Sequence, residues 1–205
     1  MIYHSFQQGS EEWHAARLGK FTGSNFHIFL GKSETRTTEL FKKAAERITG
    51  ERADQDCFKN GHTERGHDLE PLARKVYEYE TLAFVEEIGF IEADGEAIGC
   101  SPDGLIGSDG LLEIKCPDQH TFLKWCQDDY IKPEYRTQIQ FNLMVSERQW
   151  CDFVLFNRKF GENSLKIIRV NRDEVTIEKI KTALRLAEAE ISEMKKVFFQ
   201  KNLIF

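Results

Sequence analysis

Apolar residues in the first eighty positions recur at helical spacing. This periodicity predicts helices at about 11–16, 24–30, 38–49 and 63–79. Ser10 is placed to begin the first helix and Gly19 to end it, whereas Thr37 or Thr38 would begin the third and Gly50 would end it. We therefore expect an N-terminal helical segment.

After about residue 82, the spacing of the apolar residues changes from that of helices to that of strands. Short apolar runs predict strands at 83–85, 88–91, 97–100 and 111–115, then helices at 122–128 and 134–145. Strands at 150–156 and 165–170 follow, and a long helix with an apolar stripe from Ile177 to Phe198 comes last. This order predicts an α/β sandwich fold. We expect one domain over residues 1–205.

Composition narrows the class of protein. The net charge is -6, but acidic residues concentrate between positions 51 and 150, while both ends are mildly basic. Composition alone favours an ordinary acidic surface, although a cation site needs carboxylates and the basic ends could contact phosphate. No apolar run is long enough to cross a membrane. The five cysteines lack paired spacing, so we expect reduced thiols in a cytoplasmic protein.

The informative chemistry lies at the end of the predicted strand 111–115. Alternate residues of a strand share a face, so Glu113 and Lys115 point the same way and Ile114 points into the core. Asp103 is expected to end the preceding strand and to fold back beside Glu113. Because two neighbouring carboxylates repel each other unless a cation lies between them, this pair predicts a site for Mg²⁺ or Mn²⁺.

Two alternatives stay open at this point. The same spacing fits a surface ladder of salt bridges, although the apolar neighbours Leu111, Leu112 and Ile114 favour a partly buried site. Glu70 could supply a third carboxylate from the predicted helix 63–79, or it could simply be an acid favoured by the first turn of that helix.

Several motifs in order resemble those of the phage lambda exonuclease family, the lambda-type or YqaJ-like alkaline exonucleases of the PD-(D/E)XK nuclease superfamily. The resemblance covers most of the chain, from Trp13 to about Phe156, and implies a restriction-endonuclease-like core in which helices flank a central mixed sheet. Each motif is weak alone, and the ordered set is specific: Trp13-His14-x-x-Arg17-Leu18-Gly19, Thr22-Gly23-Ser24, Gly66-x-x-x-Glu70, Ser101-Pro102-Asp103-Gly104-Leu105, Leu112-Glu113-Ile114-Lys115-Cys116-Pro117 and Tyr135-x-x-Gln138-x-Gln140.

This resemblance assigns roles to residues. It implies that Asp103, Glu113 and the backbone carbonyl of Ile114 bind Mg²⁺, that Glu70 helps to arrange the metal site, and that Lys115 acts on the attacking water. Gln138 and Tyr135 would lie at the edge of the active site. A pocket for the terminal 5′-phosphate would comprise three further residues, namely Arg17, Ser24 and Ser101.

The resemblance also implies an activity and partners. We expect a 5′-to-3′ exonuclease that digests one strand of linear double-stranded DNA and releases 5′-mononucleotides. We also expect two metal ions per site, a homotrimer around the DNA, and a single-strand annealing protein as a partner in phage-type recombination. The rival interpretations are an endonuclease of the same fold, a DNA-end-binding protein without activity, and a partner-binding module. Residues 32–60 depart from the family pattern.

Overall fold

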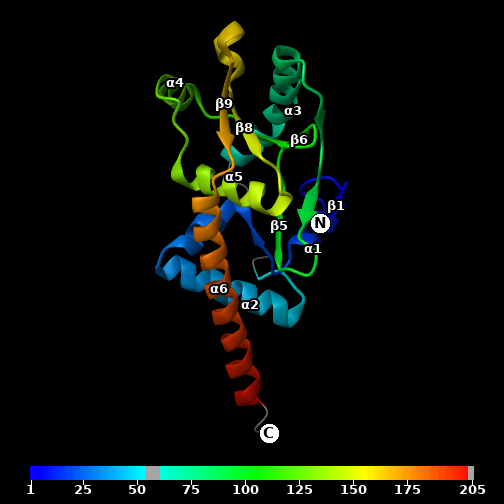
Figure 1. The fold of residues 1–205 in the computed structure, drawn as a ribbon, viewed down its shortest axis with the longest axis vertical. Helices are drawn as coiled ribbons and strands as arrows, with labels where there is room; N and C mark the ends of the chain where they lie inside the picture. The colour runs from blue at the N-terminus through cyan, green and yellow to red at the C-terminus, as the bar shows by residue number, and fades with distance from the viewer. Residues whose placement is uncertain (54–60, 203–205) are drawn as a thin grey trace.

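The computed structural model describes residues 1–53 and 61–202 of the chain (Figure 1). The N-terminal part contains β1 (Ile2–His4), α1 (Glu11–Arg17), β2 (Phe21–Thr22), the 3-10 helix η1 (Gly23–Leu30), α2 (Glu34–Thr49) and α3 (Gly61–Thr81). The rest contains β3 (Val85–Glu86), β4 (Phe90–Glu92), β5 (Ile98–Cys100), β6 (Gly104–Ile106), β7 (Gly110–Lys115), α4 (Gln119–Gln127), α5 (Pro133–Ser146), β8 (Trp150–Phe156), η2 (Arg158–Asn163), β9 (Leu165–Asn171) and α6 (Glu174–Asn202).

The strands form two mixed sheets. One has the order β1-β4-β5-β2 and the other has the order β3-β6-β7-β8-β9. Within the second sheet β7 pairs in parallel with β8, and β6 pairs antiparallel with β7. The expectation of an α/β fold with helices around a mixed sheet is confirmed, and the structure adds that the strands divide between two sheets.

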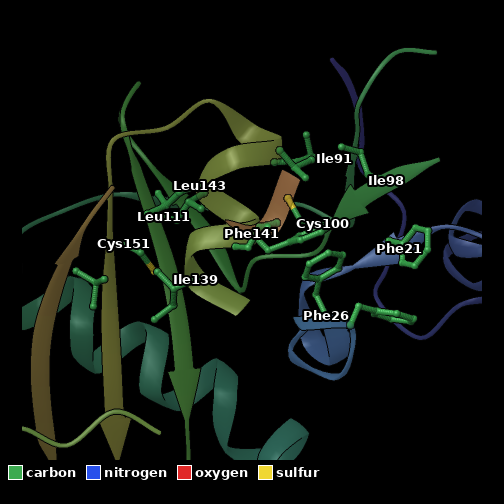
Figure 2. Close-up of a cluster of buried hydrophobic side chains, with 14 of the residues drawn as sticks. Phe21, Phe26, Ile91, Ile98, Cys100, Leu111, Ile139, Phe141, Leu143 and Cys151 are labelled. Carbon is green, nitrogen blue, oxygen red and sulfur yellow. The ribbon is translucent and has the colours of Figure 1, made fainter. Parts of the chain in front are cut away.

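Helix α5 lies between the two sheets and holds them together. It is apolar on several sides, as a buried helix must be. Its residues Ile139, Phe141 and Leu143 are fully buried in one core cluster with residues of both sheets. Figure 2 shows these side chains between Ile98, from the first sheet, and Leu111, from the second. Any chemistry placed on α5 is therefore rigidly supported.

Helix α6 packs on α2 and η1 and extends beyond the rest of the molecule (Figure 1). Its apolar stripe is buried at Ile177, Ile180, Ala187 and Ile191, as the sequence pattern predicts. Two ion pairs also join it to α2: Arg36 contacts Glu190 at 2.7 Å and Arg47 contacts Glu188 at 2.6 Å. Across the described residues, no helix is long and apolar enough to span a membrane.

The predicted N-terminal helices are present, with local differences. Ser10 caps α1 by accepting a hydrogen bond from the backbone of Trp13. The second helix is a 3-10 helix, and α2 begins earlier than Thr37 because Ser33 accepts a hydrogen bond from the backbone of Arg36. The sequence pattern did not predict the short strands β1, β2 and β6.

The cysteines that the structure describes are free thiols, which agrees with the expectation of reduced cysteines. They are Cys100, Cys116, Cys126 and Cys151. Cys57 lies outside the described residues.

Candidate active site

The β6–β7 hairpin brings Asp103 beside Glu113. We expected Asp103 to end the strand before the hairpin, but that strand, β5, belongs to the other sheet, and Asp103 lies just ahead of β6. Its backbone N–H donates to the carbonyl of Leu112 at 3.0 Å, and its Oδ2 accepts from the N–H of Ile114 at 2.6 Å. The proximity predicted from the sequence is therefore present, although a different strand pairing produces it.

Glu113 is a carboxylate buried within the protein, with only 1% of its surface exposed. Lys115 Nζ lies 2.5 Å from its Oε1, and Gln138 Nε2 donates to the same oxygen at 2.7 Å. Asn142, one turn further along α5, contacts Oε2 at 3.5 Å. Residues four apart on a helix share a face, so Gln138 and Asn142 approach the carboxylate together. This geometry replaces the surface salt-bridge ladder that the spacing alone allowed.

Lys115 lies between Glu113 and an aromatic ring. Its ammonium is 5.0 Å from the centre of the Tyr135 ring, which suits a cation–π contact. Tyr135 in turn lies near Phe153 of β8, with ring centres 5.9 Å apart. The structure therefore gathers Lys115, Gln138 and Tyr135 around Glu113, while Ile114 points into the smaller core cluster.

Glu70 approaches this group from α3. Its Oε1 lies 2.8 Å from the guanidinium of Arg74, one turn later on the same helix. Arg74 is 8% exposed and also contacts Glu87. Farther along α3, the hydroxyl of Tyr77 donates to the buried carboxylate of Asp152 at 2.7 Å, which fixes the helix against β8.

The carboxylates perturb one another's ionisation. Burial, reinforced by the charges of Asp103 and Glu113, raises the pKa of Glu70 to about 7. Burial also raises the pKa of Glu113 to about 7, in spite of the nearby Lys115 ammonium. Burial alone would lower the pKa of Lys115, but the charges of Glu113 and Asp103 outweigh it and raise this pKa. Mutual repulsion of this kind is relieved by a cation.

The donor set fits a hard divalent cation, because Asp103, Glu113 and Glu70 supply only carboxylate oxygens. The oxygens are not already arranged as a complete cage. Among the residues that the structure describes, no group of three His, Cys, Asp or Glu side chains surrounds a common point closely enough to hold a metal ion. Hydrogen bonds from Lys115 and Gln138 instead occupy one oxygen of Glu113.

A second cluster is built around Arg17 at the end of α1. Its guanidinium stacks over the Trp13 ring at 4.0 Å and donates to the hydroxyls of Ser101 and Thr22, each at 3.2 Å. Ser101 Oγ also accepts from the indole N–H of Trp13 at 2.9 Å, so its own hydroxyl hydrogen can still be donated elsewhere. Trp13 thus positions Arg17.

Ser24 differs from the other two residues assigned to the phosphate pocket. Its side chain is exposed, and no hydrogen bond joins it to Arg17 or Ser101 among the described residues. Thr22 makes the corresponding contact instead. The role of Ser24 stays a prediction.

Arg17 borders a cavity of about 270 Å³ that is rich in cations. Burial lowers the pKa of Arg17 to about 10, and burial also lowers the pKa of Lys43, which is 7% exposed. Across the described residues neither of them has a carboxylate within 4.0 Å, and Lys43 donates to the carbonyl of Lys20 at 2.6 Å. Arg17 is half-buried and Lys43 is buried. The lysines and arginines that line the cavity outnumber its two carboxylates, Glu39 and Glu46, so the cavity favours an anionic ligand.

Sequence reasoning missed Lys43, Arg74 and Asn142. Each lies on a helix at a position that fits an ordinary buried or surface residue. Their contacts come from elements far away in the chain, so no local pattern marks them. Thr22 was part of a quoted motif, but its contact with Arg17 requires the fold.

Comparisons with known proteins show the family to which the chain belongs. The family described as YqaJ-like viral recombinase domain matches residues 12–149. An alkaline exonuclease from Laribacter hongkongensis has 35% sequence identity and a TM-score of 0.87, covering 95% of this chain and 98% of its own. The same exonuclease has also been solved in complex with dAMP.

A phage-related exonuclease from Haemophilus somnus 129PT shares the fold. It has a TM-score of 0.67 and 19% identity, over 87% of this chain and 96% of its own. No curated protein matches the chain. From the family match over residues 12–149 and the likeness along nearly its whole length, the chain belongs to the YqaJ-like viral recombinase domain family.

Proposed function

We propose that this protein is a Mg²⁺-dependent exonuclease that digests one strand of linear double-stranded DNA from its 5′ end. The buried Glu113, held between Lys115 and Gln138 and beside Asp103, is the observation that carries the proposal. The likeness to an alkaline exonuclease supports a DNA exonuclease. The alternative of an inactive DNA-end-binding protein is disfavoured, because such a protein would not need a group of buried carboxylates with raised pKa values.

In this proposal Asp103 and Glu113 bind Mg²⁺ with the carbonyl of Ile114, and Glu70 completes the site. A bound Mg²⁺ ion, or a pair of ions, supplies Lewis acidity that favours deprotonation of water and offsets charge on the phosphate. Mn²⁺ should substitute, because it favours the same oxygen ligands.

Lys115 then orients the attacking water. Because neighbouring carboxylates raise its pKa, Lys115 carries its proton in the resting site and acts first as a donor and a positive charge. Gln138 keeps Glu113 in place, and the ring of Tyr135 limits where the ammonium can move.

The Arg17 cluster sets the direction of digestion. A terminal 5′-phosphate carries two negative charges, which suit the guanidinium of Arg17 and the hydroxyl of Ser101. Lys43 adds a buried positive charge to the same cavity. Because Ser101 is two residues before Asp103, a phosphate held there would place the next phosphodiester near the carboxylates. Release of 5′-mononucleotides follows, and the relative solved with dAMP supports a product of this class.

We further propose a homotrimer around the DNA, and delivery of the 3′ single strand to an annealing protein during recombination. The family membership supports this biological role.

The decisive experiment uses linear duplexes labelled at either the 5′ or the 3′ end, with Mg²⁺ or with EDTA. We expect early loss of the 5′ label, dependence on Mg²⁺, and no digestion of covalently closed circles. Cleavage of closed circles would instead indicate an endonuclease, and full activity in EDTA would refute the metal mechanism. Asp103→Ala should abolish digestion but leave DNA binding in place, because the Arg17 cluster is unchanged.

A further inference from the structure

An exposed apolar turn follows α3. Leu82 is 90% exposed, Phe84 is 80% exposed and Tyr79, on the last turns of α3, is 79% exposed. We call these three residues the Leu82 knob. Large apolar side chains this exposed and this close together mark interaction sites more often than free surface.

The backbone of the Leu82 knob is fixed by hydrogen bonds. Leu82 has a φ of +56°, in the left-handed region that branched aliphatic residues avoid. Hydrogen bonds hold the turn in this form: Thr81 Oγ1 accepts from the N–H of Ala83, and Glu78 Oε1 accepts from the N–H of Val85. Leu82 is bulky, has a strained backbone conformation and is exposed to water. This combination suggests that its side chain makes a contact that the isolated chain does not make.

A large groove lies elsewhere in the described part of the molecule. It is a groove of about 1290 Å³ between the first turns of α6 and the segment that joins η1 to α2. We call it the α6 groove. Its apolar lining includes Leu30, Val175 and Leu186, which are 43%, 67% and 58% exposed. Figure 1 places the start of α6 well away from the end of α3, so the knob cannot fill the groove of its own chain.

The charges of the α6 groove and of the Leu82 knob are complementary. The carboxylates in the groove are already paired, for Glu174 contacts Arg172, Glu178 contacts Lys181, and Glu190 contacts Arg36. Lys32 and Lys179, also in the groove, form no ion pair among the described residues. The groove therefore favours an acidic partner.

The knob provides such acids. Glu80 and Glu86 flank it, and within the described part of the chain neither one is in an ion pair. Apolar contact area with complementary charges at the rim is the composition of specific protein interfaces.

We propose that the Leu82 knob of one copy of this chain docks into the α6 groove of a second copy. The two surfaces are different, so the interface is head-to-tail, and the threefold rotation of the proposed homotrimer closes it into a ring. Each copy in the ring then has its knob covered and its groove filled. The inference rests on the proposed homotrimer only for the number of copies.

The test is the molar mass in solution, measured by light scattering and sedimentation. We expect wild type to be a closed oligomer, and Phe84→Glu or Leu186→Glu alone to be a monomer. A one-to-one mixture of these two variants should form a dimer, because one intact knob meets one intact groove. Leu123→Glu, at a 61% exposed apolar residue on α4 outside both surfaces, is the matched control and should keep the wild-type mass.

A second variant distinguishes the loss of an interface contact from misfolding. Leu82→Gly relieves the positive φ while removing the side chain, so it should keep or raise the melting temperature and still weaken assembly. Glu86→Lys should weaken assembly, and adding Lys179→Glu should restore it. A monomeric wild type, or wild-type mass in both glutamate variants, would overturn the proposal. Failure of the proposed nuclease activity can be told apart from failure of the assembly. In that case the 5′-labelled duplex stays undigested, while the wild type and the variants have the expected oligomer masses.

Discussion

At the scale of single residues, the site depends on charges that are buried together. Glu113 is fully enclosed, yet three polar side chains approach its carboxylate. Such a group is costly unless its charge is balanced, and Lys115 provides the balance in the resting structure. Substitutions here should therefore affect chemistry and electrostatics more than packing.

The first prediction concerns Lys115. Lys115→Ala should lower the single-turnover cleavage rate by roughly 10²–10⁴-fold, as expected for loss of a positioned proton-transfer or electrostatic group. Lys132→Ala removes another ammonium near the Tyr135 ring, at 5.5 Å, and serves as the control. A near-normal rate in Lys115→Ala would mean that this lysine only neutralises Glu113.

The second prediction concerns the Arg17 cluster. Arg17→Ala should reduce the ratio of initial rates on 5′-phosphate and 5′-hydroxyl duplexes, and Arg17→Lys should restore it only in part, because an ammonium cannot make a two-pronged contact. Because the structure pairs Arg17 with Thr22, Thr22→Val should lower this ratio more than Ser24→Ala. An unchanged ratio in Arg17→Ala would place phosphate recognition elsewhere.

At the scale of elements, α3 carries Glu70 and must be held firmly. Tyr77, two turns after Glu70, is 1% exposed and donates to the buried Asp152, which also binds Arg169 through two hydrogen bonds. This contact fixes α3 to β8, the strand that pairs with β7. The position of Glu70 thus depends on a network outside the active site.

The third prediction tests this network. Tyr77→Phe should lower the free energy of unfolding by about 1–3 kcal/mol, because the buried Asp152 carboxylate loses one of its hydrogen-bond donors. Tyr130→Phe, at a tyrosine that is 43% exposed and lies outside both α3 and the Leu82 knob, should change it little. Urea denaturation measures both, and equal effects in the two variants would contradict the role of the Tyr77 hydrogen bond.

Long periodic elements could be predicted from the sequence, and short ones could not. The apolar stripe of α6 and the strand 111–115 are local patterns and are present as expected. By contrast, β1 has three residues and pairs with β4, more than eighty positions later, so nothing near it signals a strand. The same reason explains why the Glu113–Lys115 pair was predictable, whereas Asn142 and Lys43 were not.

At the scale of the whole molecule, the carboxylate cluster connects stability to pH and to metal. Because Glu70 has a folded-state pKa of about 7, above its model-peptide value of 4.5, it favours the folded state at low pH. This contribution is fully present below about pH 4.5 and is lost as pH rises through about 7.

The fourth prediction follows from this loss of stability as pH rises. In EDTA, Glu70→Gln should gain in melting temperature relative to wild type as pH rises from 5 to 8, because the variant cannot acquire the unfavourable charge. Adding Mg²⁺ at pH 8 should stabilise wild type more than the variant, since a ligand stabilises the state that it binds. Differential scanning calorimetry over this pH range checks both. A melting-temperature difference that stays constant with pH would contradict the raised pKa.

The attachment of α6 to α2 has a consequence for biosynthesis. Arg47 of α2 donates to the carbonyl of Gly19, just after Arg17, and is itself held by Glu188 of α6. The ribosome releases α6 after every other described element, so this support reaches the Arg17 loop only late in translation (Figure 1). A nascent chain that stops before α6 lacks that brace. The Arg17 cluster of the proposed exonuclease thereby gains its full support only after α6 has been synthesised.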